Sequence, residues 1–276
     1  MAVEVSAAHA GTVQIGDRKV HRLGLGTNRL TDTETARTLL RHAVALGVNF
    51  VDTADVYQAT ASESTIGRTL GGNAPDVMVA TKGGMVRTPD GRGLDGHPEY
   101  LQHAVRASLQ RLGVDCIELY QLHRIDPEVP VETSVGALKE MQQAGLIRHI
   151  GLSNVTVEEL ERARRVATVV SVQNRYNILE RESEPVLDYC EAHSIVFIPW
   201  TPLLRGSFPA TRGLSEMATR LKATPQQLAL RWLLSRSPVI LPIPGTLSVA
   251  HLEENLASAD LALTEGDVHQ LSGGPG

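Results

Sequence analysis

Side chains suited to acid–base chemistry follow several short apolar runs of this 276-residue chain. Asp52, Lys82 and His123 each stand directly after such a run. A lone buried carboxylate or ammonium costs several kcal/mol unless it is paired. Asp52 and Lys82 are therefore expected to lie on neighbouring strands and to form an ion pair.

Tyr57 follows Asp52 closely and is expected to approach the Lys82 ammonium. A positive charge beside a phenol lowers its pKa from the usual value of about 10, which makes Tyr57 a proton donor. His123 is placed to hydrogen-bond a substrate oxygen. The four groups together predict a site that protonates a carbonyl as a hydride arrives, without a protein nucleophile.

Each of these residues also has a purely structural interpretation. An Asp at a strand end is commonly a helix cap or a turn former, a role that Thr53 is able to share. A loop tyrosine is commonly a surface residue, and a histidine after an apolar run is commonly structural. Trp200 is either an aromatic platform at the site or a plug of the barrel. The order of the set along the chain favours catalysis.

The elements that position these residues alternate between apolar runs and amphipathic helical patterns. In residues 33–46 the apolar side chains recur on one helix face. Runs that are apolar on both faces are typical of a buried parallel sheet. The runs cover residues 23–26, 50–54, 77–81, 116–122, 149–152, 169–172, 195–199 and 239–242.

This alternation continues over residues 1–276 without a linker and predicts one α/β domain. The expected fold is a closed (β/α)8 TIM barrel preceded by a β-hairpin in residues 13–23, with its turn at Gly16-Asp17. The structural alternative, an open doubly wound sheet, normally carries a glycine fingerprint after its first strand. Residues 24–27, GLGT, lack the third glycine of that fingerprint.

Capping boxes mark three expected helix starts. The last of the three has proline at its first helical position, which suits a helix start. The pairs are Thr31 with Glu34, Thr156 with Glu159, and Thr224 with Gln227.

Composition excludes several classes of protein. There are 26 Lys and Arg against 31 Asp and Glu, a formal net charge of −5 without a basic stripe, which argues against nucleic acid as a partner. No apolar run approaches the roughly 18 residues of a membrane span, and residues 1–10 do not resemble a signal peptide. Cys116 and Cys190 are expected to be buried thiols, and the histidines show no zinc-site spacing. We expect a soluble cytoplasmic protein without metal.

Residues 47–57, GVNFVDTADVY, followed by Thr81-Lys82 and Leu122-His123, resemble the aldo-keto reductase family. The resemblance extends over residues 20–271. It implies that Tyr57 is the general acid, that Lys82 and Asp52 tune it, and that His123 orients the carbonyl. It also implies a nicotinamide cofactor, a small carbonyl substrate and, as a default, a monomer.

The same resemblance implies a cofactor groove. Ser153, Asn154 and Gln173 resemble the clamp for the carboxamide, and Trp200 takes the place of the ring that stacks on nicotinamide. A helix expected at residues 248–256 points its first amides at the mouth, where barrels commonly hold phosphate. The implied cofactor residues are Gly26, Thr27, Asp52, Ser153, Asn154, Gln173, Trp200, Thr201, Pro202, Leu203, Arg205, Gly206, Ile243, Gly245, Thr246, His251, Glu254 and Asn255.

Two positions depart from the family pattern. Many members carry Lys at the Gly245 position and Arg at the His251 position, both contacts to the 2′-phosphate of the cofactor. Thr246 and His251 still offer hydrogen bonds, and Arg205 or Arg212 lies within reach of the phosphate. NADPH is therefore expected ahead of NADH.

The substrate pocket is expected to be open, because the closing loops at residues 83–98 and 202–213 are short. Such a pocket suits several small aldehydes or ketones. Residues 151–155, 172–178 and 223–255 look most like bacterial pyridoxal reductases, which suggests pyridoxal as a substrate. The pocket residues are Asn28, Tyr57, Met85, His123 and Trp200.

Two other functions stay open at this point. One is a Schiff-base aldolase on the same barrel with Lys82 as nucleophile, which leaves Trp200 and the helix start after Gly245 unexplained. The other is a redox sensor that binds NADPH without significant turnover, as some relatives of this fold do in association with ion channels.

Overall fold

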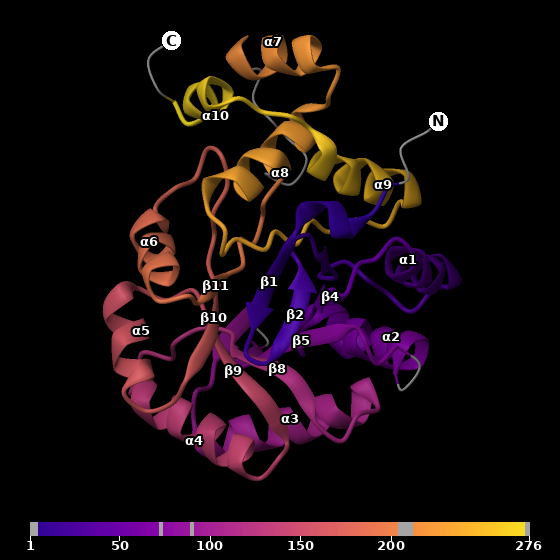
Figure 1. The fold of residues 1–276 in the computed structure, drawn as a ribbon. Coiled ribbons are helices and arrows are strands. Elements are labelled where there is room, and N and C mark those ends of the chain that lie inside the picture. The colour runs from indigo at the N-terminus through magenta and orange to yellow at the C-terminus, as the bar shows by residue number, and fades with distance from the viewer. Residues whose placement is uncertain (1–4, 72–73, 89–90, 204–211, 274–276) are drawn as a thin grey trace.

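Seven parallel strands form one curled sheet in the order β3, β4, β5, β8, β9, β10, β11 (Figure 1). The computed structural model describes residues 5–71, 74–88, 91–203 and 212–273. These strands coincide with the predicted apolar runs, so the predicted parallel sheet is confirmed. They are β3 (Leu25–Gly26), β4 (Phe50–Asp52), β5 (Met78–Gly83), β8 (Ile117–Leu122), β9 (Ile147–Ser153), β10 (Val169–Gln173) and β11 (Val196–Phe197).

The last predicted run, residues 239–242, closes the sheet without forming a regular strand. Phe197 N–H donates to Val239 O at 2.9 Å on one side, and Gly24 N–H donates to Pro242 O at 3.0 Å on the other. Pro242 has no N–H group to donate, and the same holds for Pro244, so a full ladder is impossible here. The result is a (β/α)8 barrel, as predicted, whose eighth member is irregular.

Helices surround the sheet in Figure 1 and connect successive strands. Among the described residues, no helix is long and apolar enough to cross a bilayer. The helices are α1 (Glu34–Ala45), α2 (Ala61–Leu70), α3 (Pro98–Leu112), α4 (Val131–Gln143), α5 (Val157–Arg164), α6 (Glu184–Ala192), α7 (Arg212–Leu221), α8 (Pro225–Arg236), α9 (Val249–Ala257) and α10 (Glu265–Leu271).

The predicted N-terminal hairpin is present as β1 (Thr12–Ile15) and β2 (Arg18–His21), joined by Gly16 and Asp17. Figure 1 shows it lying across the middle of the barrel. Its Ile15 and Val20 are buried together with barrel residues such as Phe50 and Leu119. The hairpin therefore plugs one end of the barrel and leaves the carboxyl ends of the strands for the site.

Two of the predicted capping boxes are confirmed and one is wrong. The hydroxyls of Thr156 and Thr224 accept from the expected third residue, with the reciprocal bond present in both cases. Helix α1 is instead capped by Thr33, which accepts from the Ala36 N–H at 3.2 Å. Thr31 lies too early, because the chain between it and α1 is still non-helical.

The segment expected to be a loop at residues 83–98 contains a second antiparallel hairpin. It consists of β6 (Met85–Thr88) and β7 (Gly91–Leu94), with Met85 opposite Leu94. Glycines and charged residues obscure the strand pattern in this stretch of sequence. The hairpin leaves the barrel at the carboxyl end of β5 and so stands at the mouth.

Candidate active site

The predicted ion pair between Asp52 and Lys82 is confirmed. Their parent strands β4 and β5 are neighbours, and Lys82 Nζ lies 2.7 Å from Asp52 Oδ2. The ammonium also donates to Thr53 O at 2.7 Å, and Lys82 is completely buried. Burial by itself lowers the pKa of Lys82, but Asp52 and then Tyr57 outweigh it, and the net pKa is raised. Lys82 is therefore held as a cation.

The second carboxylate oxygen of Asp52 is held by two amide side chains. Gln173 Nε2 donates to Oδ1 at 2.7 Å, and Gln121 Nε2 donates to the same oxygen at 3.4 Å. Gln173 was predicted at the site and Gln121 was missed. The signal for Gln121 is a fully buried amide inside the apolar strand β8.

Tyr57 and His123 complete the tetrad at the rim of the barrel. Tyr57 Oη lies 3.5 Å from Lys82 Nζ, and the rings of Tyr57 and His123 meet edge to face with centroids 5.8 Å apart. Tyr57 begins a short 3₁₀ turn, and φ is positive at the three residues that follow it, Gln58, Ala59 and Thr60. This reversal carries the chain into α2 and leaves the phenol facing the mouth. The structure thus brings all four predicted catalytic residues together.

Asn154 links three elements of the predicted carboxamide clamp. Trp200 Nε1, which is only a donor, lies 3.0 Å from Asn154 Oδ1, so the orientation of the amide is defined. Asn154 Nδ2 donates to His123 O at 3.1 Å and to Ser153 Oγ at 2.8 Å. Ser153 Oγ donates in turn to Gln173 O at 2.8 Å. The clamp residues are therefore adjacent, as predicted.

Trp200 lies at the rim and is partly exposed, so it does not plug the barrel. The barrel interior is filled instead by the aliphatic and aromatic side chains that pack under the hairpin. The guanidinium of Arg175 lies 5.6 Å from the centroid of the Trp200 ring. Thr201, with a left-handed φ of 56°, and the buried Pro202 follow it.

The backbone segments around Gly26 and Gly245 form the other side of the predicted groove. The two residues pair in a parallel bridge, and a Cβ at Gly26 would lie 2.6 Å from Ile243 O. Helix α9 follows, capped by Ser248. Of the three predicted cofactor contacts on this helix, His251 is exposed, Glu254 is half-buried and Asn255 is buried. Asn255 is therefore the least accessible of the three to a cofactor.

Arg29 is a cation that the sequence interpretation missed. Its Nη2 donates to Gly245 O at 2.9 Å, and its side chain is exposed. Its guanidinium therefore lies next to Gly245, the position at which many family members are expected to carry Lys. The nearby Thr27 hydroxyl donates to Asp52 O at 2.7 Å and so hydrogen-bonds the last residue of β4. The predicted Arg205 and Gly206 lie outside the described residues.

Met85 and Asn28 are the other predicted pocket residues, and each contacts Tyr57 or its neighbour Gln58. Met85 is buried in a cluster with Ala54 and Val56, against which Tyr57 packs. Tyr100 Oη donates to Met85 O at 3.2 Å and fixes the start of β6. Asn28 is exposed on the other side, and its carbonyl accepts from the side chain of Gln58 at 2.9 Å.

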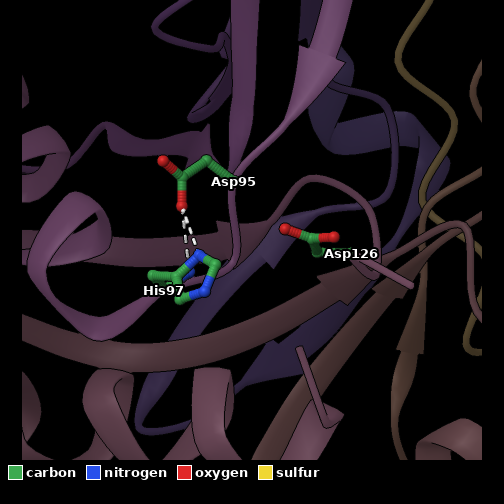
Figure 2. A group of neighbouring side chains, drawn as sticks. All are labelled: Asp95, His97 and Asp126. Atoms are coloured by element: carbon green, nitrogen blue, oxygen red, sulfur yellow. Dashed lines mark hydrogen bonds and ion pairs between the residues drawn. The ribbon is translucent and has the colours of Figure 1, made fainter. Parts of the chain in front are cut away.

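A cluster of Asp95, His97 and Asp126 stands near the base of the second hairpin (Figure 2). Asp95 Oδ1 accepts from the backbone and the ring of His97, each at 3.1 Å. The two oxygens of Asp126 accept from Gly96 N at 2.9 Å and Glu128 N at 3.0 Å. These bonds tie the hairpin to the loop after β8, and nothing in the cluster points to a cation.

The sequence of this chain is similar to known proteins over nearly its whole length. Residues 22–273 match the Aldo/keto reductase family. An uncharacterised oxidoreductase of Schizosaccharomyces pombe is 44% identical over 94% of this chain and 88% of its own length. Pyridoxine 4-dehydrogenase of Escherichia coli is 40% identical over 96% of this chain and 98% of its own length.

Solved structures show the same fold. A thermostable aldo-keto reductase in complex with the inhibitor epalrestat has a TM-score of 0.87 and 29% identity, with 95% of this chain and 98% of that one covered. An aldo/keto reductase from Klebsiella pneumoniae in complex with NADP and acetate has a TM-score of 0.84 and 26% identity, with 96% of both chains covered. On sequence and fold alike, the chain belongs to the aldo/keto reductase family and is an oxidoreductase.

Proposed function

We propose that this enzyme reduces a small aldehyde or ketone to an alcohol with NADPH, and that Tyr57 supplies the proton. The observation that carries the proposal is the contact of Tyr57 Oη with the buried ammonium of Lys82, which Asp52 holds in place. A bound dihydronicotinamide supplies the hydride. His123, whose ring meets that of Tyr57, orients the carbonyl oxygen toward the phenol.

The residues of the groove fit such a cofactor. The partly exposed ring of Trp200 offers a stacking surface beside the polar clamp of Ser153, Asn154 and Gln173. The opposite side offers glycine backbone and the cation of Arg29 near the amino end of α9, a combination suited to phosphate. The Klebsiella relative was solved with NADP, which supports the same choice here.

The electrostatics of the tetrad explain how Tyr57 releases a proton. As the proton leaves, negative charge develops on the phenol oxygen, and the ammonium of Lys82 stabilises that charge without having to move. Asp52 keeps Lys82 in position because its own two oxygens are fixed by Lys82, Gln173 and Gln121. Lys82 and Asp52 thus act through Tyr57.

The same contacts disfavour the aldolase. A Schiff base requires a neutral lysine amine, whereas Lys82 Nζ faces a carboxylate, a carbonyl and a phenol oxygen and has a raised pKa. Borohydride is accordingly expected to trap no substrate on Lys82.

Pyridoxal is the first substrate we propose. The 40% identity with a pyridoxine 4-dehydrogenase, over 98% of that protein, supports a vitamin B6 aldehyde. The residues proposed to line the mouth, Met85, Asn28 and Trp200, carry no charge that would select one aldehyde. Pyridoxal should therefore be compared with a panel of small aldehydes.

The test is the oxidation of NADPH, followed by absorbance, with pyridoxal and the panel. Wild type is expected to turn over, and Tyr57→Phe is expected to lose roughly 100-fold or more in kcat while it still binds NADPH, because only the proton donor is removed. Tyr189→Phe, a matched change at α6 where Tyr189 accepts from Arg164, should leave kcat unchanged. Tight NADPH binding without turnover of any aldehyde would favour the redox sensor.

A further inference from the structure

Asp55 is a buried acid close behind the tetrad. It is 7% exposed, and its Oδ1 has no hydrogen-bond partner among the described residues. A buried carboxylate normally accepts several hydrogen bonds, because an unpaired charge in the interior is costly. This arrangement therefore favours the neutral acid.

The backbone ties Asp55 directly to the catalytic residues. Asp55 N–H donates to Lys82 O at 3.1 Å, and Tyr57 N–H donates to Ala54 O at 3.1 Å. Lys82 Nζ donates back to Thr53 O at 2.7 Å. Residues 53–57 and Lys82 are thus one connected unit, with Asp55 in its middle.

A second buried acid, Glu63, repels the charge of Asp55 and is itself fully paired. Glu63 on α2 is completely buried and accepts from Arg111 Nε on α3 and from Thr81 Oγ1, each at 2.6 Å. The Arg111 guanidinium is therefore paired with Glu63 and not with Asp55. The other titratable groups that face Asp55 are Lys82 from β5, Tyr100 from α3 and Tyr120 from β8.

Tyr120 and Asp55 meet over Gly83. The Tyr120 hydroxyl is buried without a hydrogen-bond partner among the described residues. A Cβ on Gly83 would overlap that hydroxyl and lie 3.3 Å from Asp55 Oδ2. Glycine at this position leaves room for the phenol and the carboxyl side by side, which gives Asp55 a neutral neighbour instead of a cation.

These surroundings set the charge of Asp55. Burial, and then repulsion by Glu63, raise the pKa of Asp55 to about 7. A hydrogen bond from the Val56 backbone, and then Arg111 and Lys82, oppose the rise only in part. Two carboxyl groups in one buried cluster are costly to ionise together. Asp55 therefore changes charge close to neutral pH.

We propose that Asp55 is a positioning residue that controls the acidity of Tyr57 through its own charge. As a neutral acid it does not compete with Asp52 and Tyr57 for the positive charge of Lys82. As an anion it places negative charge near Lys82. That charge offsets part of the stabilisation that the ammonium gives to the phenolate, and it makes Tyr57 a weaker proton donor. The inference rests on the proposed function in that it takes Tyr57 as the donor.

Kinetics provide the first test. From about pH 6 to about pH 8, kcat for reduction by wild type is expected to fall roughly 3- to 10-fold as Asp55 ionises. Asp55→Asn, which keeps the size and removes the charge, should lack this inflection. Asp115→Asn, an exposed aspartate before β8, is the matched control and should keep the wild-type profile. An unchanged inflection in Asp55→Asn would overturn the proposal.

A second readout does not depend on turnover. The absorbance titration of the Tyr57 phenolate is obtained by subtracting the same protein with Tyr57→Phe. It should occur at lower pH in Asp55→Asn than in wild type, whose ionised Asp55 opposes the phenolate. Equal Tyr57 titrations in the two proteins would refute the role of Asp55. A shifted titration in a protein that reduces no aldehyde would support that role and reject the proposed function.

Discussion

At the residue scale, the site is organised around a carboxylate whose oxygens are all engaged. Lys82 binds one oxygen of Asp52, and Gln173 and Gln121 bind the other. Because these donors come from different strands, the position of Asp52 depends on the register of the whole sheet. Asp52 and Lys82 are accordingly fixed internal charges, and Tyr57 and His123 are the members that face the mouth.

Arg29 is expected to confer a preference for NADPH. Removing its charge in Arg29→Ala should raise KM for NADPH about tenfold and KM for NADH less than about twofold, because only NADPH carries the 2′-phosphate. Steady-state kinetics with each cofactor measure both values. Arg106→Ala, an exposed arginine on α3, is the control. An equal rise for the two cofactors would show that Arg29 contacts a phosphate common to both.

The sequence predicted Asp52, Lys82, His123 and the clamp because these residues stand at the ends of apolar runs. It predicted Tyr57 because that residue closely follows Asp52. Gln121 stands one residue earlier, inside such a run, and strand position alone does not mark it as a partner of Asp52. Arg29 and Asp55 lie in loops, where an Arg or Asp is usually solvated. Their significance depends on Gly245 and Glu63, which only the fold brings near.

At the element scale, the N-terminal hairpin depends on Gly16. Its φ of 58° is costly for other residues, and a Cβ there would overlap the ring of His149. Gly16→Ala is expected to lower the free energy of unfolding by about 2–4 kcal/mol without changing kcat, since the site lies at the other end of the barrel.

Gly113→Ala is the matched control for this change. Gly113 has a similar φ of 68°, but a Cβ there meets nothing within 4 Å, so the cost should be about 1 kcal/mol. Urea unfolding of both variants measures the difference. Equal losses would show that contact with His149 contributes nothing.

Helix and strand identity followed from local pattern, and the exceptions have local causes. Periodicity predicted the position of α1, but its N-cap is Thr33 and not Thr31. The N-cap is the residue whose hydroxyl accepts a hydrogen bond from the third helical N–H group, and Thr33 is in that position. The run at residues 239–242 is apolar like a strand, but Pro242 prevents a regular ladder. Neither detail is visible in hydrophobicity alone.

At the scale of the whole molecule, the two ends of the barrel have different tasks. The hairpin seals one end with apolar side chains, and the polar groups of the site gather at the other. The alternation along the chain was sufficient to predict this architecture, because a parallel barrel has few ways to bury so many apolar runs. The cluster around Asp55 occupies the layer between barrel and helices, where its charge affects stability as well as catalysis.

The stability of the protein is expected to depend on pH through Asp55. Its pKa is about 7 when folded against a normal value of 3.8, so the folded state binds more protons between these values. Stability therefore falls as pH rises from about 4 to about 7, by up to about 4 kcal/mol, and does not fall further above that range. As pH rises over this range, the free energy of unfolding of Asp55→Asn, measured with urea, should increase relative to that of wild type. The free energy of unfolding of Asp115→Asn should change with pH as wild type does.

The barrel closes irregularly at residues 239–245, which lie between β11 and β3. The other described barrel strands are joined by parallel ladders, but the segment at residues 239–245 makes only isolated bridges. On one side Gly24 N–H donates to Pro242 O at 3.0 Å and Gly26 N–H donates to Pro244 O at 3.3 Å. Strands that are joined by few hydrogen bonds separate more readily than strands joined by a full ladder. This side of the barrel includes Gly26 and Gly245. We therefore expect the wall against which the proposed cofactor lies to open more easily than the rest of the barrel.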